Sequence, residues 1–156
     1  MNHHTGHVTD FDFLTGTWHV ANRRLRERLV GCDQWDAFDG TGHCEPRLGG
    51  VVNVDELRCP GHGLNGMAVR AFDVAASQWS IHWIDHRWGR LEPPVRGGFD
   101  GPVGVFLGPD EHRGVDVTCR FTWEVLAEDR ARWTQAFSVD GTTWEDNWTM
   151  DFHRLV

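Results

Sequence analysis

Hydrophobic and polar residues alternate along most of the chain, and glycine, proline or Asp-Gly interrupts this alternation within about a dozen residues each time. The stretch Trp79-Ser80-Ile81-His82-Trp83 is one example, because large apolar side chains stand at every second position. Side chains of a β-strand point alternately to its two faces, so the pattern predicts strands with one buried face. Helical periodicity is rare, and we therefore expect an all-β protein.

About ten segments carry this strand pattern, and only short turns separate most of them. The predicted strands are 16–30, 34–45, 51–58, 64–73, 78–88, 95–99, 103–107, 115–126, 132–139 and 144–155. Leu25 and Leu29 are four residues apart, so 22–30 could instead form one or two helical turns. Short hairpins without a helical crossover predict a single up-and-down antiparallel β-barrel of about 8–10 strands, because closure removes the exposed edges.

The beginning of the chain differs from the rest. Residues 1–8 are mostly polar and predict a flexible tail, which leaves 9–156 as one barrel domain. We expect the apolar stretch Phe11-Asp12-Phe13-Leu14 to form a short helical plug at one end of the barrel, with Trp18 on its floor. An ordinary first strand with an apolar cap is the alternative.

Composition adds a cavity to this picture. The 156 residues include 9 Trp and 9 Phe but no Tyr. So many large rings in one small domain indicate either a thick core or a cavity lined with rings. A barrel of this size has room for one small ligand, so we expect a hydrophobic or aromatic molecule as the partner.

Charge and cysteine content limit the other partners and the compartment. The formal net charge of −8 opposes binding to nucleic acid, and no apolar run is long enough to cross a membrane. The N-terminus carries no signal-peptide pattern, and four cysteines without a CxxC spacing predict reduced thiols in a cytoplasmic protein. The oligomeric state stays open, although Trp35 or Trp88 on the surface would suit a homodimer.

The last two predicted strands supply the largest inner wall. A two-residue turn at Asp140-Gly141 would place Gln135 opposite Asp146 and Trp133 opposite Trp148. The residues on the inner face would be Trp133, Gln135, Phe137, Trp144, Asp146, Trp148, Met150, Phe152 and Arg154. The opposite face, with Glu145, Asn147, Thr149, Asp151 and His153, would meet solvent. A carboxylate among rings is costly unless paired, so Asp146 is a candidate acid/base group, while a position at the rim is the alternative.

The segment 78–88 has the same design. Trp79, Trp83, Asp85 and Arg87 share one face, and their apolar content predicts that this face looks inward. Asp85 and Arg87 would then approach one mouth of the cavity. Asp85 is the second candidate for acid/base chemistry, and Arg87 is a candidate ligand-binding residue.

The spacings between potential metal ligands give only weak support for a metal site. His82 and His86 would lie about 13 Å apart on a strand, too far to share one ion. The other sets are His43-Cys44-Glu45, Cys59 with His62, and the tail residues His3, His4 and His7. We predict no resident metal. The segment Arg23-Arg24-Leu25-Arg26-Glu27-Arg28 is the one local basic patch; it could hold a carboxylate or phosphate, or it could be a solvated face paired with acids.

Two motifs resemble the calycin signature, in which a Trp of the first strand packs against an Arg from the end of the barrel. They are Leu14-Thr15-Gly16-Thr17-Trp18 and Arg154. Further stretches, including Phe38-Asp39-Gly40-Thr41, Arg70-Ala71-Phe72-Asp73 and Pro93-Pro94, are similar to an uncharacterised bacterial family of calycin-like (lipocalin-type) barrels. This resemblance implies the barrel fold and no particular activity.

The opening motif also resembles that of nitrobindin-like haem barrels. That resemblance implies a haem ligated by a histidine near the C-terminus, here His153. The alternation of the last strand, however, places His153 on the outer face.

Three functions are consistent with these patterns, and no catalytic motif of high specificity chooses among them. The first is binding of an apolar or aromatic ligand. The second is a cofactor-independent cyclase or isomerase, of the kind found in biosynthesis, that uses Asp146 or Asp85 on a hydrophobic substrate. The third is haem binding. The predicted ligand-binding residues are Trp18, Trp79, Trp83, Arg87, Trp123, Trp133, Gln135, Phe137, Trp148, Met150 and Arg154.

Overall fold

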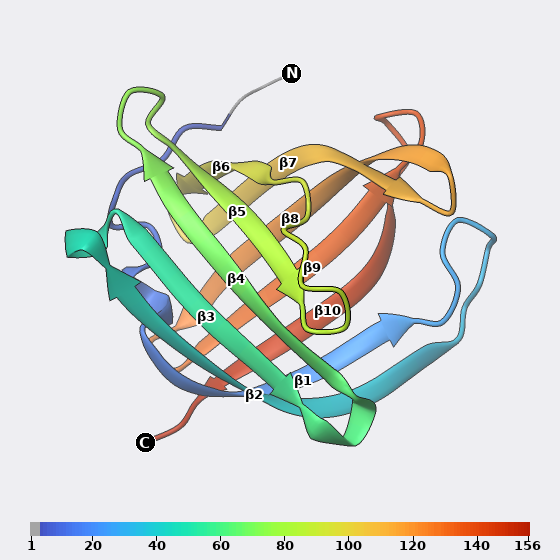
Figure 1. Ribbon diagram of the computed structural model, residues 1–156, viewed down its shortest axis with the longest axis horizontal. Helices are drawn as coiled ribbons and strands as arrows, with labels where there is room; N and C mark the ends of the chain where they lie inside the picture. Colours follow the sequence, from blue (N-terminus) through green and yellow to red (C-terminus); the bar gives the residue numbers. More distant parts are fainter. Residues whose placement is uncertain (1–3) are drawn as a thin grey trace.

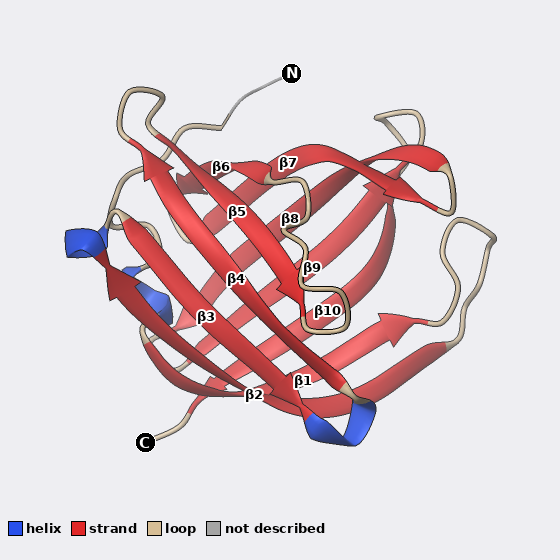
Figure 2. Ribbon diagram, viewed as in Figure 1, coloured by secondary structure: helices blue, strands red, loops and turns tan. Residues whose placement is uncertain are grey.

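The computed structural model describes residues 4–156 and shows a closed barrel of ten antiparallel strands (Figures 1 and 2). Each strand pairs with the next along the chain, and β10 pairs with β1, which confirms the predicted up-and-down barrel. No helix in the described part of the chain is both long and apolar enough to span a membrane. The strands are β1 (Gly16–Leu25), β2 (Trp35–Arg47), β3 (Val52–Cys59), β4 (Leu64–Asp73), β5 (Gln78–Asp85), β6 (Val95–Asp100), β7 (Val103–His112), β8 (Val115–Ala127), β9 (Arg130–Ser138) and β10 (Glu145–Arg154).

Two predicted strands end earlier than their sequence pattern suggests. β1 stops at Leu25, and the predicted strand up to Val30 is wrong beyond that residue, as is the helical alternative. Leu29 has a positive φ of 65°, which neither a strand nor a helix tolerates, so residues 26–34 form an irregular connection. β5 ends at Asp85 because its carbonyl accepts the amides of Trp88 and Gly89, which closes a turn.

The N-terminal segment packs against the barrel. A three-residue 3-10 helix, η1 (Asp12–Leu14), stands at the predicted plug, and both Phe11 and Leu14 are buried. The Phe11 ring lies 5.2 Å from Trp79 and 5.4 Å from Phe99, each edge to face.

Residues 4–8, predicted as a tail, contact the β4–β5 connection and β5. The Gly6 amide donates to the Ser77 carbonyl at 2.7 Å, and the Trp79 indole donates to the His7 carbonyl at 2.9 Å. The other two 3-10 turns, η2 (Leu48–Gly50) and η3 (Pro60–His62), lie in the β2–β3 and β3–β4 connections.

The register predicted for the last hairpin is wrong. The β9–β10 connection is longer than two residues, because the Asp140 carboxylate accepts the amides of Thr142 and Thr143 and holds an extended loop. A bulge between Asp146 and Trp148 then inserts one additional residue into β10. Trp148 therefore pairs with Gln135, and Met150 takes the place opposite Trp133 that the sequence assigns to Trp148.

The predicted contact between Trp18, near the start of the barrel sequence, and Arg154, near its end, is present. Trp18 and Arg154 are paired residues of β1 and β10, and the guanidinium carbon lies 4.1 Å from the indole centroid. Arg154 also donates to the carbonyls of Thr15 and Phe13, both at 2.6 Å. These bonds fasten the N-terminal segment under the buried Trp18 ring.

Candidate functional site

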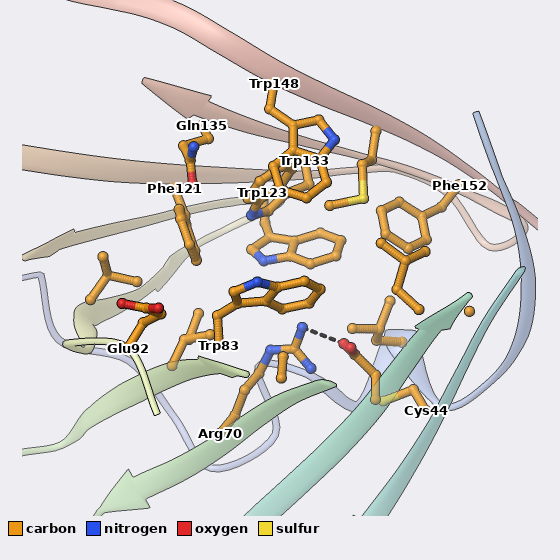
Figure 3. Close-up of a pocket in the computed structure, with 18 of the residues that line it drawn as sticks. Cys44, Arg70, Trp83, Glu92, Phe121, Trp123, Trp133, Gln135, Trp148 and Phe152 are labelled. Carbon is orange, nitrogen blue, oxygen red and sulfur yellow. Dashed lines mark ion pairs between the residues drawn. The ribbon is translucent and has the colours of Figure 1, made fainter. Parts of the chain in front are cut away.

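An aromatic cavity lies inside the barrel above Leu14 and Trp18. It holds about 110 Å³ of space that the centres of water molecules can reach, enough for a small molecule. Figure 3 shows rings from several strands around this space, with Trp83 facing a group of Trp and Phe side chains from β8, β9 and β10. The rings that line it are Trp18, Trp83, Phe121, Trp123, Trp133, Trp148 and Phe152.

Strand alternation builds this wall. Phe121 and Trp123 are inward positions of β8, and Trp133 is an inward position of the neighbouring β9. Trp133 meets Trp148 edge to face with centroids 5.3 Å apart, and it meets Phe121 at 5.0 Å. Such edge-to-face pairs hold the rings in defined orientations, so the cavity is preformed.

Seven of the residues predicted to bind a ligand line this cavity. They are Trp18, Trp83, Trp123, Trp133, Gln135, Trp148 and Met150. Gln135 supplies a polar group to the wall, and its amide nitrogen donates to Asn147 Oδ1 at 2.8 Å. The Trp148 indole donates to Asn22 Oδ1 at 2.9 Å. These two hydrogen bonds fix the orientation of Gln135 and Trp148, two side chains of the cavity wall.

Four other predicted ligand-binding residues lie outside the lining. Trp79 is buried in the core beside Phe11, and Arg154 lies under Trp18. Phe137 is buried near the mouth, where the Arg28 guanidinium lies 5.9 Å from its ring. Arg87 is half exposed and paired with Asp85.

The two predicted catalytic carboxylates also lie outside the cavity lining. Asp146 is exposed, because the β10 bulge turns Asn147 inward in its place, so the predicted inward position of Asp146 and outward position of Asn147 are both wrong. Asp85 is only 2% exposed, but Arg87 holds both of its oxygens at 3.0 and 2.7 Å. The hydrogen bonds from Arg87 lower the pKa of Asp85, so it stays ionised and has no proton to give at neutral pH.

The sequence interpretation missed a buried polar cluster on the opposite wall. Arg70 of β4 is 3% exposed and pairs with Asp55 of β3 at 2.5 Å, the ion pair drawn as a dashed line in Figure 3. Its second terminal nitrogen donates to Asn53 Oδ1 at 2.7 Å, and the Asn53 amide donates to the Cys44 thiol at 3.0 Å. Burial raises the pKa of Cys44 to about 11, so this thiol stays protonated.

This cluster is a polar patch among aromatic rings, and the charges of Arg70 and Asp55 compensate each other. The Arg70 guanidinium carbon lies 4.9 Å from the Phe11 centroid and 5.7 Å from that of Trp123. Two buried donors, Arg70 Nε and Trp123 Nε1, have no hydrogen-bond partner within residues 4–156. Because Asp55 neutralises Arg70, the inner end of the cavity carries no net charge.

Two further carboxylates that the sequence interpretation did not single out line the cavity toward its mouth. Asp110 belongs to β7, and Glu92 lies in the β5–β6 connection. Burial raises the pKa of Asp110, and the negative charge of Glu92 adds to that effect. The Glu111 amide donates to Asp110 at 2.7 Å, and among the described residues no cation lies within 4.0 Å of this carboxylate.

Alternation could have revealed Arg70 and Asp110. Arg70 shares its β4 face with the buried Leu64 and Ala68, and Asp110 shares its β7 face with the buried Phe106. For Asp55 the alternation is misleading, because the apolar Val52 and Val54 lie on the opposite face of β3 and suggest that this opposite face is the inner one. In the structure that face is only partly buried. Leu57 and Cys59, both buried, show that the face of Asp55 is the inner one.

The residues that could hold a metal or haem are dispersed. Within residues 4–156, no three His, Cys, Asp or Glu side chains lie close enough together to bind one ion, and His3 lies outside the described residues. His153, the haem ligand that the nitrobindin resemblance implies, is exposed on the outer face of β10. It cannot reach an iron inside the cavity, so the residues present do not fit a haem held in this way.

Comparisons with protein-family models and with curated proteins give no match to this sequence. The function must therefore be inferred from the site.

Proposed function

We propose that the protein binds a small apolar or aromatic molecule in the cavity of its barrel. The observation that carries this proposal is the preformed space lined by seven Trp and Phe rings inside a closed barrel. Rings offer a large apolar contact area with few rotatable bonds, so little conformational entropy is lost when a flat ligand enters. The resemblance to calycin-like barrels is consistent with such a role.

Ala68 allows a direct test. It lines the cavity on β4 opposite Trp83, while Ala37 is exposed on β2. Isothermal titration calorimetry with the neutral aromatic 2-naphthamide should show binding to the wild type and to Ala37→Leu. Ala68→Leu fills the space with three more carbon atoms, and we expect it to weaken binding at least about tenfold, since even one or two methylenes in a tight pocket are worth that much.

A second blocking variant guards against loss of folding. A Cβ at Gly42, which also lines the cavity, would lie 3.4 Å from Val20, so Gly42→Val enters the space without a backbone clash. Binding that persists in both folded variants would place the ligand elsewhere and refute the proposal.

Asp110 favours one alternative, a small enzyme of the cyclase or isomerase type that uses a carboxyl group as acid/base. Its raised pKa and its place in the cavity lining are what such a group requires. The test uses the molecule that co-purifies with the protein, followed by mass spectrometry during incubation. Conversion by the wild type that is lost in Asp110→Asn would support the enzyme, and equal conversion by both would exclude Asp110 as the acid/base group.

A further inference from the structure

A second pocket, open to solvent, neighbours the aromatic cavity, because Arg24 in its lining packs on Trp148 of the cavity wall. Its walls are the end of β1, the β1–β2 connection, the start of β2 and the turn η3. Figure 1 shows the β1–β2 connection extending past the strand ends toward the β7–β8 hairpin. The ionisable residues around this pocket are Arg24, Arg26, Arg28, Asp36 and His62, so arginine dominates it in a protein whose net charge is −8.

Two of these arginines have no counter-ion in contact. Arg26 is paired with Asp36 at 2.8 Å, and nearby Arg87 is paired with Asp85. Neither Arg24 nor Arg28, however, has a carboxylate oxygen within 4.0 Å among residues 4–156, and the buried Arg28 Nε has no hydrogen-bond partner there.

Both free guanidinium groups are partly buried against rings. The Arg24 guanidinium carbon lies 4.5 Å from the centroid of Trp148, a ring of the cavity wall, and Arg28 lies over Phe137. Burial lowers the pKa of Arg24 to about 10, with the charge of Arg28 as the next cause, and burial also lowers the pKa of Arg28. Two like charges thus lie within electrostatic reach of each other, partly desolvated and without contact to an anion, which is unfavourable unless an anion binds there.

The backbone holds Arg28 in this place. The Leu29 amide donates to the Glu145 carboxylate at 2.7 Å, which ties the β1–β2 connection to the start of β10. The positive φ of Leu29 is a further cost of this loop conformation, of the kind often found at functional sites.

We propose that Arg24 and Arg28 form an anion site, and that the molecule bound by this protein carries a carboxylate or phosphate at the end that faces the cavity mouth. Arginine forks suit both groups, because their planar N–H donors match the oxygens of a carboxylate or phosphate. The inner end of such a ligand would be apolar, since Asp55 already neutralises Arg70 there. This inference rests on the proposed function and adds the chemical class of the ligand.

The acids that face the two arginines do not replace an anion. Glu145 and Asp110 both raise the pKa of Arg28 through their charge, and Asp85 does so for Arg24, but only at longer range. Glu145 is already engaged by the Leu29 amide, and Asp85 by Arg87. A bound carboxylate or phosphate could instead accept N–H bonds from both guanidinium groups directly.

The test compares ligands that differ in charge but share one ring system. Isothermal titration calorimetry measures 2-naphthoate, 2-naphthyl phosphate and the neutral 2-naphthamide against the full chain. We expect at least one anion to bind about tenfold more tightly than the amide or better, since a charge-assisted hydrogen bond contributes a factor of about 10 to 100. The tighter anion identifies whether a carboxylate or a phosphate is preferred.

Variants then assign the effect to residues. Arg24→Gln and Arg28→Gln should each lower the ratio of the affinity for that anion to the affinity for 2-naphthamide about tenfold. Both should fold, because neither side chain makes a hydrogen bond or ion pair in the described structure. The matched control is Arg23→Gln, because Arg23 is exposed on the outer face over Trp35.

The outcomes separate this inference from the proposed function. If the amide binds and the anions bind no better, or if Arg23→Gln loses as much anion affinity as the other two variants, the anion site is refuted and the cavity proposal stands. If none of the three probes binds, both fall.

Discussion

Breaking the buried ion pair between Arg70 and Asp55 should cost more stability than breaking any surface pair of this protein. The Arg70 side chain is 4% exposed and that of Asp55 17%. Asp55→Asn keeps the size of the side chain but leaves the guanidinium charge buried with only neutral amide groups as hydrogen-bond partners. Removal of one partner of a buried pair costs about 3–5 kcal/mol, and the residual exposure of Asp55 reduces this to about 2–4 kcal/mol.

Urea unfolding followed by Trp fluorescence and by far-UV circular dichroism measures this cost. For a chain of 156 residues, each kcal/mol shifts Tm by about 2–4 °C, so we expect thermal unfolding to show a Tm lower by about 4–16 °C. The triple variant Arg70→Met, Asp55→Leu and Asn53→Leu removes both charges together with the buried amide that accepts from Arg70, and it should return to within about 1 kcal/mol of the wild type. Asp151→Asn breaks the exposed pair with Arg132 and is the control, with a cost of about 0–1 kcal/mol.

Two results would refute this reasoning. If Asp55→Asn and Asp151→Asn cost the same, water must screen Arg70, and the charge would not be buried. If the triple variant is as unstable as Asp55→Asn alone, the loss comes from packing and not from the unpaired charge.

Three other predictions follow from single contacts. Arg154→Met should destabilise the barrel by about 2–4 kcal/mol in urea unfolding, because it removes the hydrogen bonds to Thr15 and Phe13 and the cation–π contact with Trp18; a cost below about 1 kcal/mol would contradict a stabilising role of these contacts. Gly66→Ala should abolish 2-naphthamide binding, because its Cβ would overlap the Trp83 ring of the cavity wall, while Gly61→Ala, with nothing within 4 Å, should bind as the wild type does. Hydrogen bonds from the amides of Thr143 and Thr142 hold the pKa of Asp140 well below its usual range, so its stabilising effect is full above the unfolded-state pKa near 3.8 and is lost as pH falls below it. Asp140→Asn should therefore flatten the fall of Tm in acid, and an unchanged acid limb would show that these bonds do not stabilise the loop.

The last hairpin shows where prediction from the sequence stops. Its two strands are evident from alternation, but their pairing depends on the loop that Asp140 organises and on the bulge at Asn147. A shift of one residue moves a side chain from one face of a sheet to the other, so Asp146, predicted inside, is exposed. Neither the loop conformation nor the bulge has a local sequence pattern that is strong enough to predict it.

The buried polar groups show the same limit. Asp55 lies on a strand whose apolar residues favour the opposite face, and its partner Arg70 is on the next strand. Only the pairing of β3 with β4 and the closure of the barrel bring the two together, and the same closure leaves Arg24 and Arg28 without acids in contact.

Sequence patterns alone establish the all-β class, the order of the strands, the up-and-down barrel and the contact of Trp18 with Arg154. These features follow from alternation and turn residues, which act between near neighbours, or from a recognisable motif. The three-dimensional arrangement of the strands sets which polar side chains face the cavity, which of them are neutralised and which remain free. Those properties depend on register, bulges and closure, which set distances between residues far apart in the chain.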